Sequence, residues 1–288
     1  GFTMVAENVP IDFRGKIVMI ANSCFFMGEL LGCLTAYFTV DSLTSGDWQS
    51  LTLWSNSTLL LALILNFLFL DESVRYQLVM GKAEEGFKLL DKIISFNEKK
   101  NVRPLTEEEK QGLIKWQATL SQEFTNQDVA SVGALFRHGY KIITLIIWLG
   151  WFINSFIYYG LVLVLPEILE EMNSDYDDSS DLASITISVL IESISIVLAF
   201  IFISAQRIGR KQSLMLFYFL TAGSGVMAFF ATTGNMVVVW ATVAKIFINV
   251  CSFYFYLYTV EVYPTKYRAT GMGVASAVGK LGVIIMPW

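Results

Sequence analysis

The sequence predicts an all-helical membrane protein, and three observations support this. Of the 288 residues, 55% are hydrophobic and only 16% are charged, whereas soluble domains carry about 25% charged residues. The mean hydropathy is +0.56. Seven apolar runs are each long enough to cross a bilayer as a helix, which takes about 20 residues. Such a chain has too little polar surface to cover a water-soluble fold of this size.

The apolar runs divide the chain into three parts. We expect the seven helices near 17–40, 51–70, 142–165, 182–205, 213–232, 237–259 and 270–287. Strands are excluded because membrane strands are shorter and alternate in polarity. The expected parts are the end of a first bundle with two spans in 1–70, a polar linker with amphipathic helices in 71–141, and a second bundle in 142–288. The second bundle holds five spans, and we expect the last to be truncated.

The basic residues indicate an orientation. If the connections alternate, one side of the membrane holds 18 of the 20 Lys and Arg residues, and the opposite connections hold none. The basic connections are 1–16, 71–141, 206–212 and 260–269, and the others are 41–50, 166–181 and 233–236. Because cytoplasmic loops are enriched in Lys and Arg, we expect the basic side to face the cytoplasm or an organelle matrix.

Composition also limits the chemistry. His138 is the only histidine, and the three cysteines lie in apolar runs without the spacing of a metal motif, so we expect no metal site. The net charge of −5 does not favour binding to nucleic acid, so we expect no nucleic-acid partner. The sequence shows no nucleophile–base set and no nucleotide-binding loop, so we expect neither an enzyme nor a cofactor. We expect the apolar helices to contact the lipid bilayer.

One pattern occurs twice. Glu-x2-Pro-x3-Arg runs from Glu7 to Arg14 before the first span and from Glu261 to Arg268 before the seventh. Both copies lie on the same predicted side of the membrane, six spans apart. Two parallel six-helix repeats explain this arrangement, and the chain would then hold spans 5–11 of a twelve-span protein. Glu and Arg at these helix ends could pair as a conformational latch.

These patterns resemble the major facilitator superfamily. Residues 207–211 (Arg-Ile-Gly-Arg-Lys) resemble its Asp-Arg-x-Gly-Arg-Arg/Lys loop, and residues 71–76 resemble the Pro-Glu-Ser-x-Arg sequence after its sixth span. Residues 154–162 are similar to the synaptic-vesicle-2-related branch, neighbours of the organic ion transporters. The resemblance implies a secondary active transporter of a small organic ion or metabolite that works by alternating access. It adds Arg207 and Arg210 to the latch and points to an internal membrane of a vesicle or organelle.

The loop motif departs from the family pattern at two positions. Gln206 stands where the family has Asp, and Phe202 stands where it has Gly. The first change removes a charge partner, and the second opposes close helix approach. These changes favour an alternative function, a transporter-derived structural or interaction subunit that contacts membrane-protein partners and does not transport.

Four ionisable residues lie inside predicted spans, where such groups are costly and usually face the bundle interior. They are Glu29, Glu192, Lys245 and Lys280. We expect Glu192 and Lys280 at the substrate cavity, and Glu29, Glu192 and Lys245 in ion coupling or as buried charges. Glu192 could be protonated as a coupling carboxylate, and Lys280 could bind either Glu192 or an anionic group. The alternatives are structural ion pairs, snorkelling ends and, for Glu29, close helix packing at its neighbouring glycines.

Polar and aromatic residues in two spans suggest the rest of the cavity. Asn154 and Tyr158 share one face of their helix, and Tyr256 belongs to an aromatic run in the sixth span. We expect these three to line the substrate cavity, because a tyrosine-rich wall with few charges suits an amphiphilic organic ion. The alternative is ordinary packing between helices.

Overall fold

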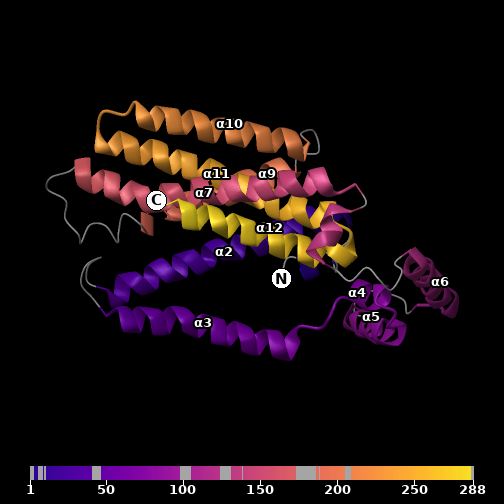
Figure 1. The fold of residues 1–288 in the computed structure, drawn as a ribbon. Helices are drawn as coiled ribbons and strands as arrows, with labels where there is room; N and C mark the ends of the chain where they lie inside the picture. Colours follow the sequence, from indigo (N-terminus) through magenta and orange to yellow (C-terminus); the bar gives the residue numbers. More distant parts are fainter. Residues whose placement is uncertain are drawn as a thin grey trace.

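The computed structural model is a bundle of α-helices (Figure 1). It describes residues 3–5, 9, 11–40, 47–97, 105–123, 131–137, 139–172, 186–187, 189–204 and 209–286. The longer helices are α2 (Ile11–Thr39), α3 (Trp48–Phe69), α7 (Lys141–Met172), α9 (Ile194–Ser204), α10 (Arg210–Phe229), α11 (Gly234–Val262) and α12 (Thr265–Ile285). These residues form helices and contain no strand, so the predicted all-helical fold is confirmed.

Among the residues that the structure describes, five helices are long and apolar enough to cross a membrane. They are Phe13–Thr39, Trp48–Phe69, Lys141–Leu163, Arg210–Phe229 and Gly234–Val262. The predicted span at 182–205 is described only in part, and its stretch Val189–Ile203 is a shorter apolar helix. The seventh predicted span is α12, whose 21 residues include four glycines and two lysines that lower its hydropathy.

The described parts of the linker form short helices. They are α4 (Val74–Val79), α5 (Ala83–Asn97), α6 (Glu107–Glu123) and the 3-10 helix η2 (Val132–Phe136). Helix α5 is amphipathic, because its apolar residues Phe87, Leu90 and Ile94 recur at helical spacing and are half-buried. A capping box precedes α6, because the Thr106 backbone N–H donates to Glu109 Oε2 at 2.9 Å and the Glu109 backbone N–H donates to Thr106 Oγ1 at 3.4 Å.

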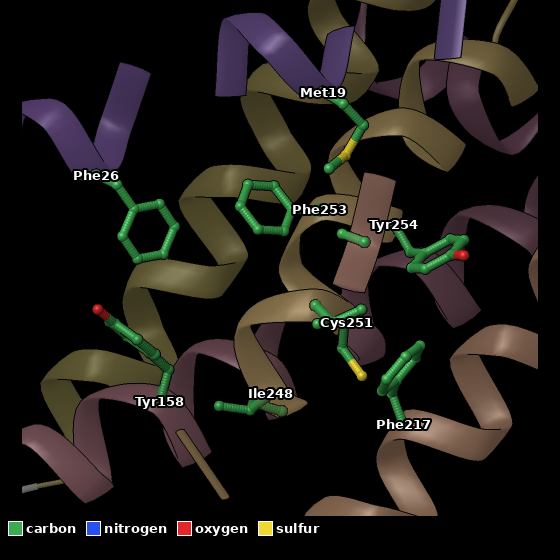
Figure 2. Packing of buried hydrophobic residues seen from close by; sticks show 10 residues of the cluster. Met19, Phe26, Tyr158, Phe217, Ile248, Cys251, Phe253 and Tyr254 are labelled. Carbon is green, nitrogen blue, oxygen red and sulfur yellow. The ribbon is translucent and has the colours of Figure 1, made fainter. Parts of the chain in front are cut away.

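Helix α11 forms the centre of the core, where it contacts α2, α7, α9, α10 and α12. The largest buried cluster contains Met19, Phe26, Tyr158, Ala199, Phe217, Ile248, Val250, Cys251, Phe253 and Tyr254. Figure 2 shows Phe26 of α2 facing Phe253 of α11, with their ring centroids 5.9 Å apart. This aromatic contact joins α2 to the helices that follow residue 141.

Two groups of helices therefore meet at α2. We call α2 and α3 the N-terminal pair, and α7 with α9–α12 the C-terminal bundle. Helix α3 has no buried side chain, and it contacts α2. Its apolar side chains are open to the surroundings; Phe67, for example, is 88% exposed. An apolar face of this kind is stable in contact with lipid, because lipid tails are as apolar as the side chains themselves.

Along the chain, successive connections between the described helices lie at opposite ends of the bundle (Figure 1). Helices α4–α6 and the α11–α12 turn lie at one end, and the α10–α11 turn lies at the other (Figure 1). This arrangement agrees with the alternation assumed in assigning the basic side. Which end faces the cytoplasm stays a prediction.

Helix α12 lies directly against α7. A Cβ atom added at Gly282 would lie 2.6 Å from the Phe152 backbone oxygen, and one at Gly279 would lie 2.9 Å from Ser155 Oγ. The two backbones can approach this closely because glycine has no side chain. The contact places Lys280 of α12 beside the aromatic residues of α7.

Candidate functional site

A pocket lies between α2, α7, α11 and α12. It contains about 760 Å³ of empty space, including the solvent at its mouth. Its walls are polar and aromatic, formed by Asn22, Phe25, Phe26, Trp151, Asn154, Ser155, Tyr158, Tyr159, Asn249, Ser252, Phe253, Phe255, Tyr256, Ser276 and Lys280. Of the five residues expected at the cavity, Asn154, Tyr158, Tyr256 and Lys280 line this pocket. Glu192 is not among its lining residues.

Hydrogen bonds fix part of the pocket wall. Asn154 Nδ2 donates to Ser252 Oγ at 2.6 Å, which joins α7 to α11. Trp151 Nε1 donates to Thr259 Oγ1 at 3.0 Å, and the Trp151 ring meets Tyr256 edge to face with the centroids 4.7 Å apart. The aromatic wall is therefore held in place before any ligand binds.

Lys280 brings a positive charge to the pocket. Its Nζ donates to Tyr159 Oη at 3.4 Å and lies 5.2 Å from the centroid of that ring. Its side chain is exposed. Among the described residues, no carboxylate lies within ion-pair distance of Lys280. Glu192, one of the two partners expected for Lys280, is paired with Lys245 instead.

Glu192 is instead paired with Lys245. The Lys245 Nζ lies 2.7 Å from Glu192 Oε2, and Asn249 Nδ2 donates to Glu192 Oε1. Glu192 is completely buried, and Lys245 is 8% exposed. A buried charge is tolerated when it is paired and hydrogen-bonded. These two residues thus neutralise each other inside the C-terminal bundle.

Glu29 reaches the same region from the N-terminal pair. Tyr158 Oη donates to Glu29 Oε1 at 3.4 Å, and Lys245 Nζ lies 5.7 Å from the centroid of the Tyr158 ring. We call Glu29, Tyr158, Glu192, Lys245 and Asn249 the charge cluster; all of them except the half-buried Glu29 are buried. The cluster spans the contact between the N-terminal pair and the C-terminal bundle. The structure therefore brings together the three residues expected in coupling or as buried charges.

The glycines beside Glu29 do not form a close contact within the described structure. A Cβ atom at Gly28 or Gly32 would meet nothing within 4 Å. Packing at these glycines, the alternative explanation for Glu29, is therefore not seen among the described residues.

Part of the predicted latch is assembled at the end of the bundle where α10 begins. Arg210 forms an ion pair with Glu261 at the end of α11. A Cβ atom at Gly15 of α2 would lie 3.9 Å from Arg210 Nη2, and Arg14 is the residue before this glycine. The Arg210–Glu261 ion pair thus lies beside the start of α2.

The other latch residues differ in their placement. Arg268 is 4% exposed, and its Nε donates to the Val260 backbone oxygen at 2.7 Å, which fixes the α11–α12 turn. Glu7, Arg207 and Gln206 lie outside the described residues. The ring of Phe202 packs edge to face on Phe217 of α10, with centroids 5.0 Å apart.

Replacing Glu261 with Gln should lower the free energy of unfolding by no more than about 1 kcal/mol, because partly exposed ion pairs contribute little. The Arg210 side chain is 45% exposed and that of Glu261 is 18% exposed. Chemical unfolding in detergent measures the change. Asp71→Asn, which removes the exposed pair with Lys92, is the matched control. A loss of several kcal/mol in Glu261→Gln alone would contradict a modest role in stability.

Sequence reasoning missed several pocket residues. Asn249 lies one helical turn from Lys245, so a search for polar residues at i and i+4 around the buried lysine would have found it. Asn22, Phe25 and Phe26 of α2 carried no such signal, because their place in the pocket depends on how α2 packs against α7 and α11.

Apolar helices that enclose a polar pocket and a cluster of charged residues are typical of an integral, multi-pass membrane protein. Comparison with known families agrees with this class. The model of the Major Facilitator Superfamily matches residues 1–287. The chain belongs to the Major Facilitator Superfamily, a family of membrane transporters.

The chain is similar to synaptic vesicle 2-related proteins and to named transporters. It is 27% identical over 304 residues to the Synaptic vesicle 2-related protein of Xenopus laevis, which covers 99% of this chain and 52% of that protein. It is 26% identical over 289 residues to the Niacin transporter NiaP of Acinetobacter baylyi, covering 99% of this chain and 60% of that protein. The predicted family and its synaptic-vesicle-2-related branch are thus confirmed. The chain spans about half the length of the curated relatives it matches first.

A solved structure supports the fold. The proton:xylose symporter XylE, bound to 6-bromo-6-deoxy-D-glucose, matches with a TM-score of 0.69 and 20% sequence identity. The match covers 100% of this chain and 58% of that structure. The described helices therefore form part of a major facilitator fold.

Proposed function

We propose that this chain forms part of a secondary active transporter that moves a small organic ion by alternating access. The pocket carries this proposal, because it is lined by α2 of the N-terminal pair and by α7, α11 and α12 of the C-terminal bundle. Movement of one group against the other would change both the lining of the pocket and its opening. The pocket and the transporter relatives support transport over the structural-subunit alternative.

The chemistry of the pocket favours an organic anion with a flat ring. Lys280 offers a positive charge without a carboxylate partner among the described residues. Trp151, Tyr159 and Tyr256 offer aromatic surfaces close to that charge. An aromatic monocarboxylate satisfies both features, with its carboxylate at Lys280 and its ring against the aromatic wall. The niacin transporter among the relatives supports this class.

The proposal also divides the chain into three units and orients the bundle in the membrane. The units are the two helices in 1–70, the linker in 71–141 and the bundle in 142–288. The end that carries α4–α6 faces the cytoplasm or a matrix-like compartment, because the basic connections belong to it. Similarity to a synaptic vesicle 2-related protein supports an internal membrane such as that of a vesicle.

Binding by the purified full-length protein tests the substrate class. Benzoate and nicotinate should raise the thermal unfolding temperature, whereas tetraethylammonium, xylose and nucleotides should not. An anion at about 100 times its dissociation constant adds about 2.7 kcal/mol of stability. Lys280→Ala should abolish the shift with benzoate.

Lys211→Ala is the matched control for that experiment, because it removes a basic residue at the exposed start of α10. It should leave the shift with benzoate unchanged. Equal shifts in wild type and Lys280→Ala would contradict the placement of the carboxylate. A shift with tetraethylammonium in place of benzoate would contradict the anionic substrate class.

A further inference from the structure

A second cavity lies between the N-terminal pair and the C-terminal bundle. It is lined by Met19, Ile20 and Ser23 of α2 and by Ile196, Val197 and Phe200 of α9. None of these residues lines the pocket that contains Lys280. We call this cavity the α2–α9 groove; it contains about 460 Å³ of empty space, including the open space at its mouth.

The walls of the groove are apolar. Ser23 is the one polar residue among those that line it, and its Oγ donates to the Ile20 backbone oxygen at 2.7 Å. The hydroxyl proton of Ser23 is therefore already used within α2. Ordered water in a cavity needs two to four polar partners. The groove thus favours a hydrocarbon ligand over water or a polar solute.

The mouth and the floor of the groove differ in exposure. Ile20 and Val197 at the mouth are 54% and 59% exposed. Met19 at the floor is 2% exposed and belongs to the largest buried cluster (Figure 2). The groove is therefore open at the surface of the helices and closed against their core. In a membrane-spanning bundle, an open apolar surface of this kind is stable in contact with lipid tails.

A lysine lies at one end of the groove. Lys16 is exposed and precedes Ile20 by four residues and Ser23 by seven, so the three share one face of α2. Along the helix axis, Lys16 is about 6 Å from Ile20. Lys16 forms no ion pair with a side chain that the structure describes. The two helices come together at this end, because a Cβ atom at Gly15 would lie 3.3 Å from Ile203 Cγ2.

We propose that the α2–α9 groove binds an anionic phospholipid, with one acyl chain in the groove and the phosphate headgroup beside Lys16. An apolar groove that ends at an exposed ammonium group fits a molecule with a hydrocarbon chain and an anionic head. A lysine near the end of a spanning helix extends its ammonium towards the membrane surface, where the lipid phosphates lie. Basic residues at that depth attract anionic lipids.

A lipid in this groove contacts both groups of helices. Three of the lining residues belong to α2 of the N-terminal pair, and three belong to α9 of the C-terminal bundle. A ligand shifts a conformational equilibrium by its difference in affinity for the two states. The phospholipid therefore favours the arrangement of α2 and α9 in which this groove exists. Binding of the lipid does not depend on the proposed transport function.

Photocrosslinking of the purified full-length protein in detergent micelles tests this inference. The probes are phosphatidylglycerol and phosphatidylcholine, each with a diazirine in the middle of one acyl chain, and mass spectrometry locates the labelled peptides. In wild type, phosphatidylglycerol should label the α2 and α9 segments about fivefold more than phosphatidylcholine. Lys16→Gln should lower labelling by phosphatidylglycerol to the level of phosphatidylcholine. Lys211→Gln, which changes an exposed lysine at the start of α10, should leave it unchanged.

A substitution that fills the groove tests the position of the acyl chain. Val197→Trp places a large ring in the groove and should lower labelling of the α2 and α9 segments by both lipids to background. Val239→Trp on α11 is the matched control, because Val239 is 58% exposed and does not line the groove. It should leave labelling unchanged. Circular dichroism shows whether each variant keeps its helices.

Four results would overturn the inference. Equal labelling by the two lipids that persists in Lys16→Gln would show ordinary contact with bilayer lipid, and unchanged labelling in folded Val197→Trp would place the acyl chain elsewhere. No label on either segment in wild type would show that another part of the full-length protein covers the groove. Loss of labelling on addition of glycerol 3-phosphate would show a site for a soluble phosphate. The labelling requires no transported substrate, so lipid binding and the proposed transport function fail separately.

Discussion

Replacing Lys245 with Met is expected to lower the free energy of unfolding by about 3–5 kcal/mol, because it leaves a buried carboxylate without its counter-ion. Glu192 has no exposed surface, and its two oxygens are held by Lys245 and Asn249. Chemical unfolding of the full-length protein in detergent micelles measures the loss. This is the largest single effect that the structure predicts.

The control is the double variant that also changes Glu192 to Gln. Removing both partners of a buried pair is often close to neutral, because no uncompensated charge remains. The double variant should therefore be more stable than Lys245→Met alone. If Lys245→Met were as stable as wild type, the ion pair would not be formed in the folded protein. If the double variant were the less stable of the two, packing of the long side chains would outweigh their charges.

Replacing Gly282 with Val should lower the free energy of unfolding by about 3 kcal/mol, at the upper end of the range for overpacked cores. The new Cβ would lie 2.6 Å from the backbone oxygen of Phe152 and 3.3 Å from the backbone nitrogen of Phe156. Because backbone atoms cannot turn aside as a flexible side chain can, α12 would have to move away from α7. Thermal unfolding of the purified variant gives the change.

Gly273→Val on the same helix provides the matched comparison. A Cβ at Gly273 would meet nothing within 4 Å. Its substitution should therefore change the stability by less than about 1 kcal/mol, the range of helix propensities for ordinary residues. Equal losses at both positions would show that the effect comes from the helix itself and not from the close contact with α7.

Features set by local sequence were predicted well. The apolar runs of about 20 residues predicted helices that the structure contains, and the polar linker was predicted to hold further helices, which are α4–α6. Asn154 and Tyr158 lie on one helical face, and both line the pocket. Each of these depends on residues close together in the chain.

Features set by contacts between distant helices were harder to predict. The sequence placed Glu29, Glu192 and Lys245 inside spans but could not show which charges would pair. Only the packing of α11 against the segment before α9 places Lys245 beside Glu192. The sequence also could not show whether Lys280 would pair with Glu192, because the position of Lys280 depends on how α12 lies against α7.

The latch was predicted in part. Arg210 and Glu261 are 51 positions apart in the numbering, and they pair because α10 and α11 run side by side from the far turn back to this end. The repeated Glu-x2-Pro-x3-Arg pattern suggested that Glu261 would lie close to Arg268. In the structure, Arg268 donates its Nε hydrogen bond to the backbone of Val260.

Uptake of radiolabelled benzoate by proteoliposomes that contain the full-length protein tests the central claim most directly. The account predicts saturable uptake in wild type and in Lys211→Ala, and uptake at the level of protein-free liposomes in Lys280→Ala. Saturable uptake in Lys280→Ala equal to that of wild type would contradict the assignment of this pocket as the transport site.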